Sequence, residues 1–348
     1  TDSSSEPRLA VVVINTRAVD MTIECLESLL RIDSPPLRVI LCDNNEDDAP
    51  LERVRGWAQG RVPFDPGSVR AEHRPLLSPP AAKPVEHVVL EREEAESGMR
   101  GCDARLVMVR NRANLGFAGG NNVGLRHVLA CGREEYVWLL NNDTVAEPQA
   151  PGEMVRALAA DPSAGMCGST VLVHDEPDTL ECLCGYSFNR WSARVAPWGQ
   201  GARRPRPGDP VPDPAELDYL YGASLMLTRS FLERVGLLDE DFFLFFEEMD
   251  LAMRARGLFT KTCAPTAAVF HRRGGSVDSR DPAAGRKQLF AKYHWSRSRL
   301  VFMRKHNRWA LPGIYWRMAK SMAAAAVRGE GEYARVLLAA LRGEPFPF

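Results

Sequence analysis

The sequence predicts an α/β fold with a Rossmann-like, mostly parallel central sheet flanked by helices, followed by a C-terminal helical region. Short apolar runs rich in branched residues are typical of strands that are covered on both faces. Each run stops in a polar cluster, and helical spacing of apolar residues follows the first run. Strands that alternate with helices imply right-handed crossovers, and such sheets bind ligands beyond the carboxyl ends of their strands.

The elements follow this pattern in order. The first strand is predicted over residues 9–14 and ends at Asn15-Thr16. A helix is predicted over residues 19–30, because apolar residues recur there at helical spacing and Pro35-Pro36 prevent its continuation. Further strands are predicted over residues 37–42, 106–109, 136–140 and 267–270.

The composition excludes several classes of protein. The 348 residues include 44 Lys and Arg against 45 Asp and Glu, a net charge of −1, which does not suit a general nucleic-acid binder. Hydrophobic residues at 45% and charged residues at 26% exclude disordered, collagen-like and coiled-coil chains. Because the sequence has no apolar run of about 20 residues and no signal-like N-terminal segment, we expect a cytoplasmic protein.

Eight cysteines are spread between Cys25 and Cys263, and their spacing fits no common zinc framework. We expect all of them to be reduced thiols.

Residues 51–101 interrupt the pattern with six prolines, at positions 63, 66, 75, 79, 80 and 84, followed by a charged run over residues 91–94. About fifty residues is far longer than a usual connection, so we expect an insertion that is partly helical at its start, mobile later and peripheral to the sheet. A second stretch rich in proline and arginine, residues 199–214, is predicted to be a surface loop. The main domain is expected over residues 1–275 and the C-terminal helical region over residues 276–348.

The C-terminal region is predicted to be helical from residue 288 to 341, with a break around residues 323–329. Between residues 314 and 328, apolar side chains such as Tyr315 and Trp316 alternate with Arg317, Lys320 and Arg328. This mixture suits weak association with an anionic membrane surface at the inner face of the membrane. The alternative that we favour is packing against the main domain or against a second subunit in a homodimer.

Residues 114–124 concentrate four glycines and three asparagines just before a helical pattern over residues 123–129. Glycines let the backbone approach a phosphate or a base closely, and a helix N-terminus favours anions. Neither the dinucleotide fingerprint nor the P-loop is present. A tight turn capped by Asn121 or Asn122 is the structural alternative.

Two other polar clusters could carry chemistry. Asn141-Asn142-Asp143 offers the oxygen ligands that Mg²⁺ or Mn²⁺ prefers, although a turn that caps the following helix would use the same residues. Glu247, Glu248 and Asp250 follow an aromatic run at the start of a predicted helix. A carboxylate beside apolar surface has the raised pKa of a general base, whereas acidic residues at a helix N-terminus also satisfy the helix dipole.

His271 ends a strand-like run and precedes Arg272-Arg273-Gly274-Gly275. It could ligate a metal or contact a diphosphate, although a single histidine usually has a structural role.

Taken together and in order, these motifs resemble the family 2 glycosyltransferases with the GT-A fold, most closely the bacterial rhamnosyltransferase-like branch. The resemblance runs from Val11 to about His306. Its landmarks are residues 11–15, 42–44, 114–124, 139–144, 221–224 and 245–254, and His271.

The resemblance implies that Asp43 contacts the nucleobase of a dTDP- or UDP-sugar. It also implies that Asn141 and Asp143 occupy the position that holds the ribose and a Mg²⁺ or Mn²⁺ ion, with asparagine replacing the first aspartate, and that His271 assists the metal or the diphosphate. The other residues that would line the nucleotide-sugar pocket are Asn15, Asn114, Gly116, Phe117, Gly119, Gly120 and Asn121.

On the acceptor side, the resemblance implies that Gly222, Ala223, Ser224 and Glu247 border the acceptor pocket. Glu248 falls where the family has its catalytic aspartate, and Asp250 is the rival candidate for the base. The implied reaction is an inverting, metal-dependent transfer of a sugar to a hydroxyl of a glycan, a lipid-linked saccharide or a natural product.

Two other functions compete with a transferase. A sugar-phosphate nucleotidyltransferase has a related sheet, but it should show a glycine-rich, arginine-containing loop where Asn15-Thr16-Arg17 follows the first strand. A non-catalytic sugar-nucleotide-binding protein would need no base, and the presence of candidates for both a metal ligand and a base argues against it.

Overall fold

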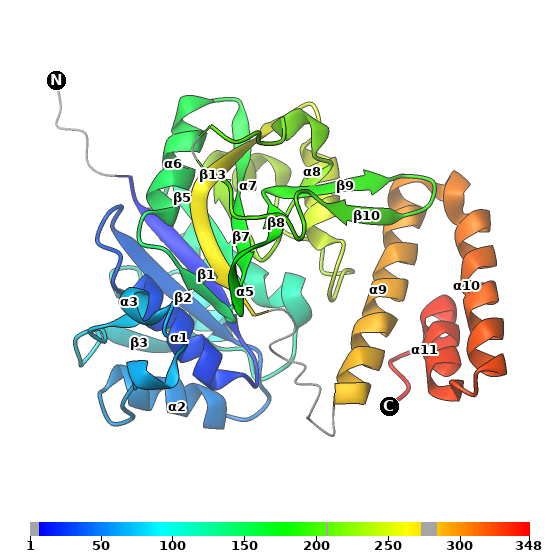
Figure 1. Cartoon of the computed structure of the whole chain (residues 1–348). Helices are drawn as coiled ribbons and strands as arrows, with labels where there is room; N and C mark the ends of the chain where they lie inside the picture. The colour runs from blue at the N-terminus through cyan, green and yellow to red at the C-terminus, as the bar shows by residue number, and fades with distance from the viewer. Residues whose placement is uncertain (1–6, 207, 273–283) are drawn as a thin grey trace.

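The computed structural model describes residues 7–206, 208–272 and 284–348. Its centre is a ten-stranded sheet in the order β3-β4-β2-β1-β5-β12-β7-β13-β6, with β8 paired to β7 (Figure 1). The parallel strands β1 (Leu9–Asn15), β2 (Leu37–Asp43), β4 (Leu106–Arg110) and β5 (Tyr136–Leu140) are those that the apolar runs predicted. Every residue of β1 and β2 is buried, which explains why these strands read as continuous apolar sequence. The predicted α/β fold is confirmed.

The second half of the sheet is mixed. β12 (Ser224–Thr228) runs antiparallel to both β5 and β7 (Ala164–Val173), and β13 (Thr260–His271) runs parallel to β7. The remaining strands of this half are β6 (Thr144–Ala146) and β8 (Glu176–Leu183). A separate three-stranded sheet holds β9 (Gly185–Asn189), β10 (Arg194–Pro197) and β11 (Tyr219–Leu220).

Helices cover both faces of the sheet. The alternate residues Leu9, Val11 and Val13 of β1 pack into a cluster with α1 (Val19–Leu29), α2 (Ala49–Ala58) and α6 (Ala150–Ala160). Ala10 and Val12 point to the opposite face, which is covered by α5 (Gly116–Cys131), α7 (Arg229–Val235) and α8 (Glu247–Ala255). This arrangement places the carboxyl ends of β1, β2, β4 and β5 at one edge.

Three helices form the C-terminal region, α9 (Ala284–His306), α10 (Leu311–Val327) and α11 (Gly331–Arg342), with a short 3₁₀ turn at Arg308–Ala310 between α9 and α10 (Figure 1). The predicted break therefore lies at residues 328–330. α9 contacts the main domain, where the Trp295 ring meets the rings of Phe245 and Phe246. Among the helices that the structure describes, none combines the length and apolar character required to span a bilayer.

The prediction that residues 51–101 form a peripheral insertion is wrong. After α2 and a 3₁₀ turn at Pro66–Ser68, this segment forms α3 (Arg74–Leu77), the edge strand β3 (His87–Glu91) and α4 (Arg92–Ser97). β3 pairs in parallel with β4, and His73 and Leu77 have no exposed surface. The His73 ring packs on Phe270 of β13 and its Nε2 lies 2.8 Å from the His174 carbonyl oxygen. The many prolines concealed this packing, because they interrupt periodicity without preventing burial.

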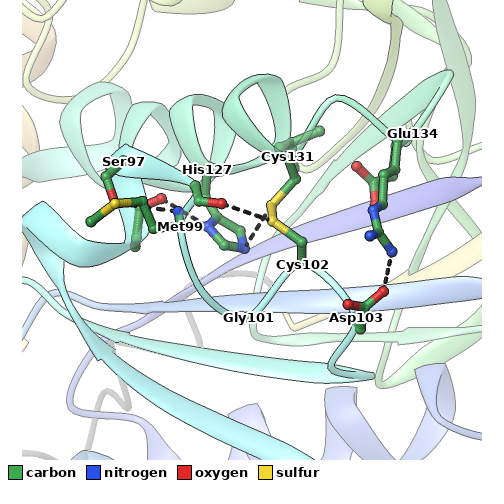
Figure 2. The surroundings of a disulfide bond; sticks show 12 residues. Ser97, Met99, Gly101, Cys102, Asp103, His127, Cys131 and Glu134 are labelled. Atoms are coloured by element: carbon green, nitrogen blue, oxygen red, sulfur yellow. Dashed lines mark hydrogen bonds and ion pairs between the residues drawn. A yellow bond between two sulfur atoms is a disulfide. The ribbon is translucent and has the colours of Figure 1, made fainter.

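The expectation of eight reduced thiols is wrong for two cysteines. Cys102 and Cys131 form a disulfide that joins the turn after α4 to the last residue of α5 (Figure 2). The two Cα atoms are 5.5 Å apart although 29 residues separate the cysteines in sequence. Their proximity depends on the packing of α4 against α5, where His127 Nδ1 lies 2.8 Å from the Ala95 carbonyl oxygen, and sequence spacing cannot reveal it.

The packing of the inserted segment leads to a stability prediction. We expect Leu77→Ala to lower the free energy of unfolding by about 2 to 5 kcal/mol, because it empties a fully buried site. Leu76→Ala is the matched control, since Leu76 is only partly buried and its truncation should cost less. Urea denaturation followed by circular dichroism measures both values. Equal, small losses would show that the segment does not belong to the core.

Candidate active site

The carboxyl ends of β1 and β2 bring Asn15 and Asp43 side by side, since they are paired in register. The Asn15 amide donates to Asp43 Oδ1, and so does the amide of Asn45 at 2.8 Å. Thr22 on α1 donates its hydroxyl to Asn15 Oδ1 at 2.8 Å and fixes the orientation of that amide. Burial raises the pKa of Asp43 to about 6, although the two amide donors favour the ionised form. Both hydrogen bonds end on Oδ1.

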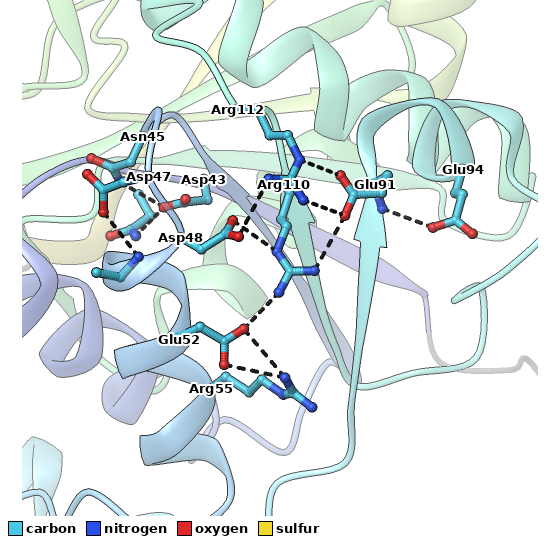
Figure 3. Close-up of polar contacts among 12 residues, drawn as sticks. Asp43, Asn45, Asp47, Asp48, Glu52, Arg55, Glu91, Glu94, Arg110 and Arg112 are labelled. Atoms are coloured by element: carbon cyan, nitrogen blue, oxygen red, sulfur yellow. Dashed lines mark hydrogen bonds and ion pairs between the residues drawn. The ribbon is translucent and has the colours of Figure 1, made fainter.

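A network of ion pairs continues this edge outward from Asp43 (Figure 3). Arg110, the last residue of β4, is the register partner of both Asp43 and Glu91 of β3. Its guanidinium lies 2.7 Å from Glu52, 3.3 Å from Asp48 and 3.4 Å from Glu91. The segment that was expected to be peripheral therefore supplies two carboxylates, Glu52 and Glu91, to the same sheet edge.

The glycine-rich segment is part of a helix rather than the loop before one. α5 begins at Gly116, seven residues before the predicted start, and Gly116 has a positive φ of 70°. A Cβ atom there would lie 2.3 Å from the carbonyl oxygen of Phe243, which accepts the Phe117 N–H at 2.7 Å. At Gly120 a Cβ atom would lie 2.6 Å from the Asn44 amide nitrogen. These glycines allow α5 to approach two loops of the site edge closely.

The asparagines of this segment hold its backbone. Asn114 Oδ1 accepts the Gly116 N–H at 3.1 Å, and the Asn121 amide donates to the Phe117 carbonyl at 3.0 Å. Asn122 bonds to the backbone of Leu238 in both directions. At Gly119 a Cβ atom would lie 2.9 Å from Leu115 Cβ, so close packing within the helix start accounts for that glycine.

Asn141, Asp143 and His271 meet at the ends of β5 and β13. His271 Nε2 lies 3.2 Å from Asp143 Oδ1 and 3.3 Å from the Asn141 amide nitrogen, while Nδ1 lies 2.9 Å from Glu181 Oε2. Burial lowers the pKa of His271, but the two carboxylates outweigh it and raise that pKa to about 10. The imidazole is therefore held as a cation between Asp143 and Glu181.

This arrangement fits a divalent cation in part. A histidine that binds a metal gives up the proton on the ligating nitrogen, so a cation beside Asp143 would replace the Nε2 proton. Glu181 would then orient the ring through Nδ1–H, as carboxylates commonly do for metal-bound histidines. Over residues 7–206, 208–272 and 284–348, no group of three or more His, Cys, Asp or Glu side chains is arranged to hold a metal ion. The remaining ligands would have to come from a bound molecule.

Glu247 and Glu248 open α8 beside the predicted acceptor residue Gly222. A Cβ atom on Gly222 would lie 3.4 Å from Glu248 Oε1 and 3.7 Å from the Phe117 ring, so the structure brings these three residues together. Burial raises the pKa of Glu247 and of Glu248, and the charge of Glu248 raises the pKa of Glu247 further. In the described part of the chain, Oε2 of each glutamate is buried without a hydrogen-bond partner.

The backbone before α8 is strained. Phe245 and Phe246 have φ values of 68° and 74°, in the left-handed region that a bulky residue rarely adopts. Such a conformation persists only where surrounding contacts enforce it, and here the Trp295 ring packs on both phenylalanines. Arg273 and Gly274-Gly275, which follow His271 and Arg272 in the sequence, lie outside the described residues.

Two predicted site residues lie elsewhere. Asp250 faces the C-terminal region, where its carboxylate bonds to Arg254, Lys305 and His306, each at 2.7 Å. Burial opposes ionisation of Asp250, but these partners lower its pKa to about 2. Ser224 is fully buried in the sheet, and its hydroxyl accepts hydrogen bonds from the Trp138 indole and the Ser169 hydroxyl. Ala223 contributes only its carbonyl, which accepts the Asn141 N–H at 3.1 Å.

Sequence reasoning missed Glu181 and the role of Tyr221. The Tyr221 hydroxyl donates to Glu181 Oε1 at 2.8 Å, and its ring meets His271 edge-on at 6.1 Å. One signal in the sequence could have indicated Glu181, because it is a charged residue within the apolar run Leu180 to Cys184. A charged side chain that is buried usually has a partner.

The chain is similar in sequence to two glycosyltransferases. The low-salt glycan biosynthesis hexosyltransferase Agl10 of Haloferax volcanii is 24% identical over 178 residues, 49% of this chain and 53% of that protein. The N-acetylglucosaminyl-diphospho-decaprenol L-rhamnosyltransferase of Mycobacterium tuberculosis is 29% identical over 129 residues, 36% of this chain and 39% of that protein. The chain thus spans about half or less of these curated relatives. No protein-family model matches it.

Two solved structures with a similar fold are also glycosyltransferases. The mannosyltransferase PcManGT from Pyrobaculum calidifontis, in complex with GDP-Man and Mn²⁺, is 17% identical with a TM-score of 0.49, covering 97% of this chain and 87% of that chain. GalNAc-T7 with UDP, GalNAc and Mn²⁺ is 12% identical with a TM-score of 0.48, and the match covers 78% of this chain and 45% of that chain. Because both scores are below 0.5, the roles of individual residues must come from the geometry of this chain.

The close contact at Gly116 can be tested. Gly116→Ala should lower the free energy of unfolding by more than the about 1 to 2 kcal/mol of a left-handed alanine, because its Cβ would meet the Phe243 carbonyl. Gly132→Ala is the matched control, since Gly132 has the same φ of 70° and nothing within 4 Å of its Cβ position. Thermal and urea unfolding compare the two variants. If both lost the same stability, the contact between α5 and the 243–246 loop would be unimportant.

Proposed function

We propose that this chain is an inverting, metal-dependent glycosyltransferase that moves a sugar from a dTDP- or UDP-sugar to an acceptor hydroxyl. The observation that carries the proposal is the meeting of Glu248, Gly222 and Phe117 at the site edge, where a carboxylate with a raised pKa borders the glycine-rich start of α5. The similarity to a hexosyltransferase and a rhamnosyltransferase supports the same class of reaction.

In this proposal Glu248 is the general base. A carboxylate with a raised pKa is a better proton acceptor than one at its ordinary value, and Glu248 is only partly buried, so an acceptor can reach it. Burial keeps the pKa of Glu248 raised, and the charge of Glu248 in turn raises the pKa of the buried Glu247 beside it. Asp250 is unsuitable, since Arg254, Lys305 and His306 all bond to its carboxylate and keep it ionised and occupied.

The donor would lie along the edge formed by β1, β2 and β5. Asp43 Oδ2 is the oxygen left to accept an N–H from the base, because Asn15 and Asn45 both bond to Oδ1. The start of α5 would face the sugar and the diphosphate, which a helix N-terminus favours. Asn141, beside Asp143, would contact the ribose.

The chemistry needs one proton acceptor and no enzyme nucleophile. Glu248 takes the proton of the acceptor hydroxyl while the oxygen of that hydroxyl bonds to the anomeric carbon. The bond from the anomeric carbon to the diphosphate oxygen breaks, and its electron pair leaves with the diphosphate. The nucleoside diphosphate leaves from the opposite face, so the anomeric configuration inverts. A divalent cation held by Asp143 and His271 would neutralise charge on the diphosphate. Gly222, which has no side chain, would leave room for the acceptor beside Glu248.

Release of nucleoside diphosphate from a panel of dTDP- and UDP-sugars, with Mn²⁺ and without acceptor, tests the reaction class. A transferase should hydrolyse its donor slowly. A nucleotidyltransferase would instead release or consume pyrophosphate, and a binding protein would show a thermal shift without turnover. The rhamnosyltransferase-like branch predicts that dTDP-rhamnose is among the donors that turn over.

The base assignment predicts that Glu248→Gln lowers donor turnover by about 10² to 10⁴-fold while donor affinity stays nearly unchanged, because shape is kept and the proton acceptor is lost. Asp250→Asn is the comparison. It should lose less turnover and about 1 to 3 kcal/mol of stability, since it weakens the bonds of this side chain to Arg254, Lys305 and His306. Turnover assays with an acceptor, together with thermal unfolding, separate the two effects. Full activity in Glu248→Gln would exclude it as the base.

The metal assignment predicts that Asp143→Ala abolishes the rise in melting temperature that Mn²⁺ and a nucleoside diphosphate produce together in the unmodified chain. The variant should also be less stable than the unmodified chain without ligand, because Asp143 is one of the two carboxylates that hold the buried His271 as a cation, so the shift is measured against each variant's own ligand-free melting temperature. Asp103→Ala, at an exposed carboxylate beside the disulfide, is the control and should keep the full shift. An undiminished shift in Asp143→Ala would move the metal elsewhere.

A further inference from the structure

The basic charge of this chain is concentrated in its C-terminal helices. Residues 284–348 contain thirteen Lys and Arg against three Glu, a net charge of +10, and no acidic residue occurs between positions 284 and 329. Since the whole chain carries −1, residues 1–283 carry −11. The near-neutral total therefore conceals a strongly divided charge.

The outward face of α10 carries a row of apolar residues beside the exposed Lys320. Ile314, Met318 and Ala325 point inward and are buried. Exposed apolar residues recur at helical spacing and, with one residue of the 3₁₀ turn before α10, form what we call the outer stripe, which consists of Trp309, Pro312, Trp316, Ala319, Ala323 and Val327. Trp309, Trp316 and Val327 are 81%, 65% and 89% exposed. A helix that is apolar on both faces has a second surface to bury.

A third exposed tryptophan lies next to the outer stripe. Trp191, 56% exposed, is at the tip of the β9–β10 hairpin, which reaches over the ends of α9 and α10 (Figure 1). The hairpin is fastened there on both sides of Trp191, because Asn307 donates to the Arg190 carbonyl at 2.8 Å and Arg317 donates to the Ser192 carbonyl at 2.9 Å.

Basic side chains accompany the aromatic rings. Arg308 and Lys320 are exposed, and Lys320 Nζ lies 5.6 Å from the centre of the Trp316 ring. Arg304 is exposed and donates to the Tyr315 hydroxyl at 3.3 Å. Tryptophan at the level of the headgroups, with lysine and arginine on either side, is the combination that holds a helix in the plane of an anionic membrane.

We infer that the outer stripe, with Trp191, docks the protein on the surface of a membrane that contains anionic lipids. A second copy of this chain fits less well, because a symmetric contact through this face would bring two regions of charge +10 together. The divided charge also orients the molecule, since the acidic main domain is repelled by the surface that attracts α10.

The docked helices are linked directly to the candidate site. Asp250, two residues after Glu248, bonds to His306 at 2.7 Å, and His306 lies three residues before Trp309 of the outer stripe. The inference does not depend on the proposed reaction, because binding to vesicles is measured without a sugar donor.

Flotation with phosphatidylcholine vesicles, with or without phosphatidylglycerol, tests the inference on the full chain. The unmodified protein should float only with phosphatidylglycerol and less at high salt. The double variant Trp309→Ser/Trp316→Ser should reduce the bound fraction by about tenfold or more. Met99→Ser is the matched control, because Met99 is 83% exposed on the main domain and should not matter.

A second pair of variants tests the charge separately. Arg308→Glu/Lys320→Glu should abolish flotation, whereas Arg100→Glu/Arg156→Glu, at exposed arginines of the main domain, should leave it unchanged. Donor hydrolysis without vesicles and the melting temperature should match the unmodified chain in all of these variants. Absence of flotation in the unmodified chain, or undiminished flotation of the tryptophan variant, would overturn the inference. A dimer in light scattering that the tryptophan substitutions dissociate, without vesicle binding, would overturn it in favour of a second copy.

Discussion

The parallel pairing of β1 with β2 is the constraint on which the candidate site depends. It places Asn15 opposite Asp43, and the continuation of the same ladder places Arg110 and Glu91 beside them. A shift of one residue in a strand would exchange its two faces and turn buried valines away from the core, so the register is strongly specified. The hydrophobic pattern of four strands therefore determines which polar residues meet at the sheet edge, before any of them contributes an interaction of its own.

The strands of this edge could be predicted from sequence because they are buried on both faces, and their ends agree with the predicted ends to within about one residue. The rest of the sheet was harder. Strands such as β8 and the first half of β13 contain exposed charged or polar residues, so they do not stand out from loops. β3 was hidden among prolines, and the pairing of Cys102 with Cys131 depends on the packing of two helices that are distant in sequence.

The residues of the candidate site were predicted unevenly for the same reason. Residues at strand ends, such as Asp43 and Asp143, are marked by the end of an apolar run. Glu181 is not marked in this way, because its role depends on its contact with His271, which is ninety residues away in the chain. The glycines of α5 were recognised, but their conformation was not. Helix interiors disfavour glycine, and the close approach of Phe243 and Asn44 explains why Gly116 and Gly120 have no side chain.

The divided charge of the chain has a consequence for how fast the site can be reached. A nucleoside diphosphate sugar is an anion, and it would approach a domain of charge −11, whose field slows association when little salt is present. Added salt screens this repulsion over a distance of about 10 Å at 0.1 M. The same ions weaken attraction between the basic helices and an anionic surface. A rise in ionic strength thus has opposite effects on the two ends of one molecule. It speeds association of a nucleotide sugar with the main domain and weakens binding of the C-terminal helices to an anionic membrane.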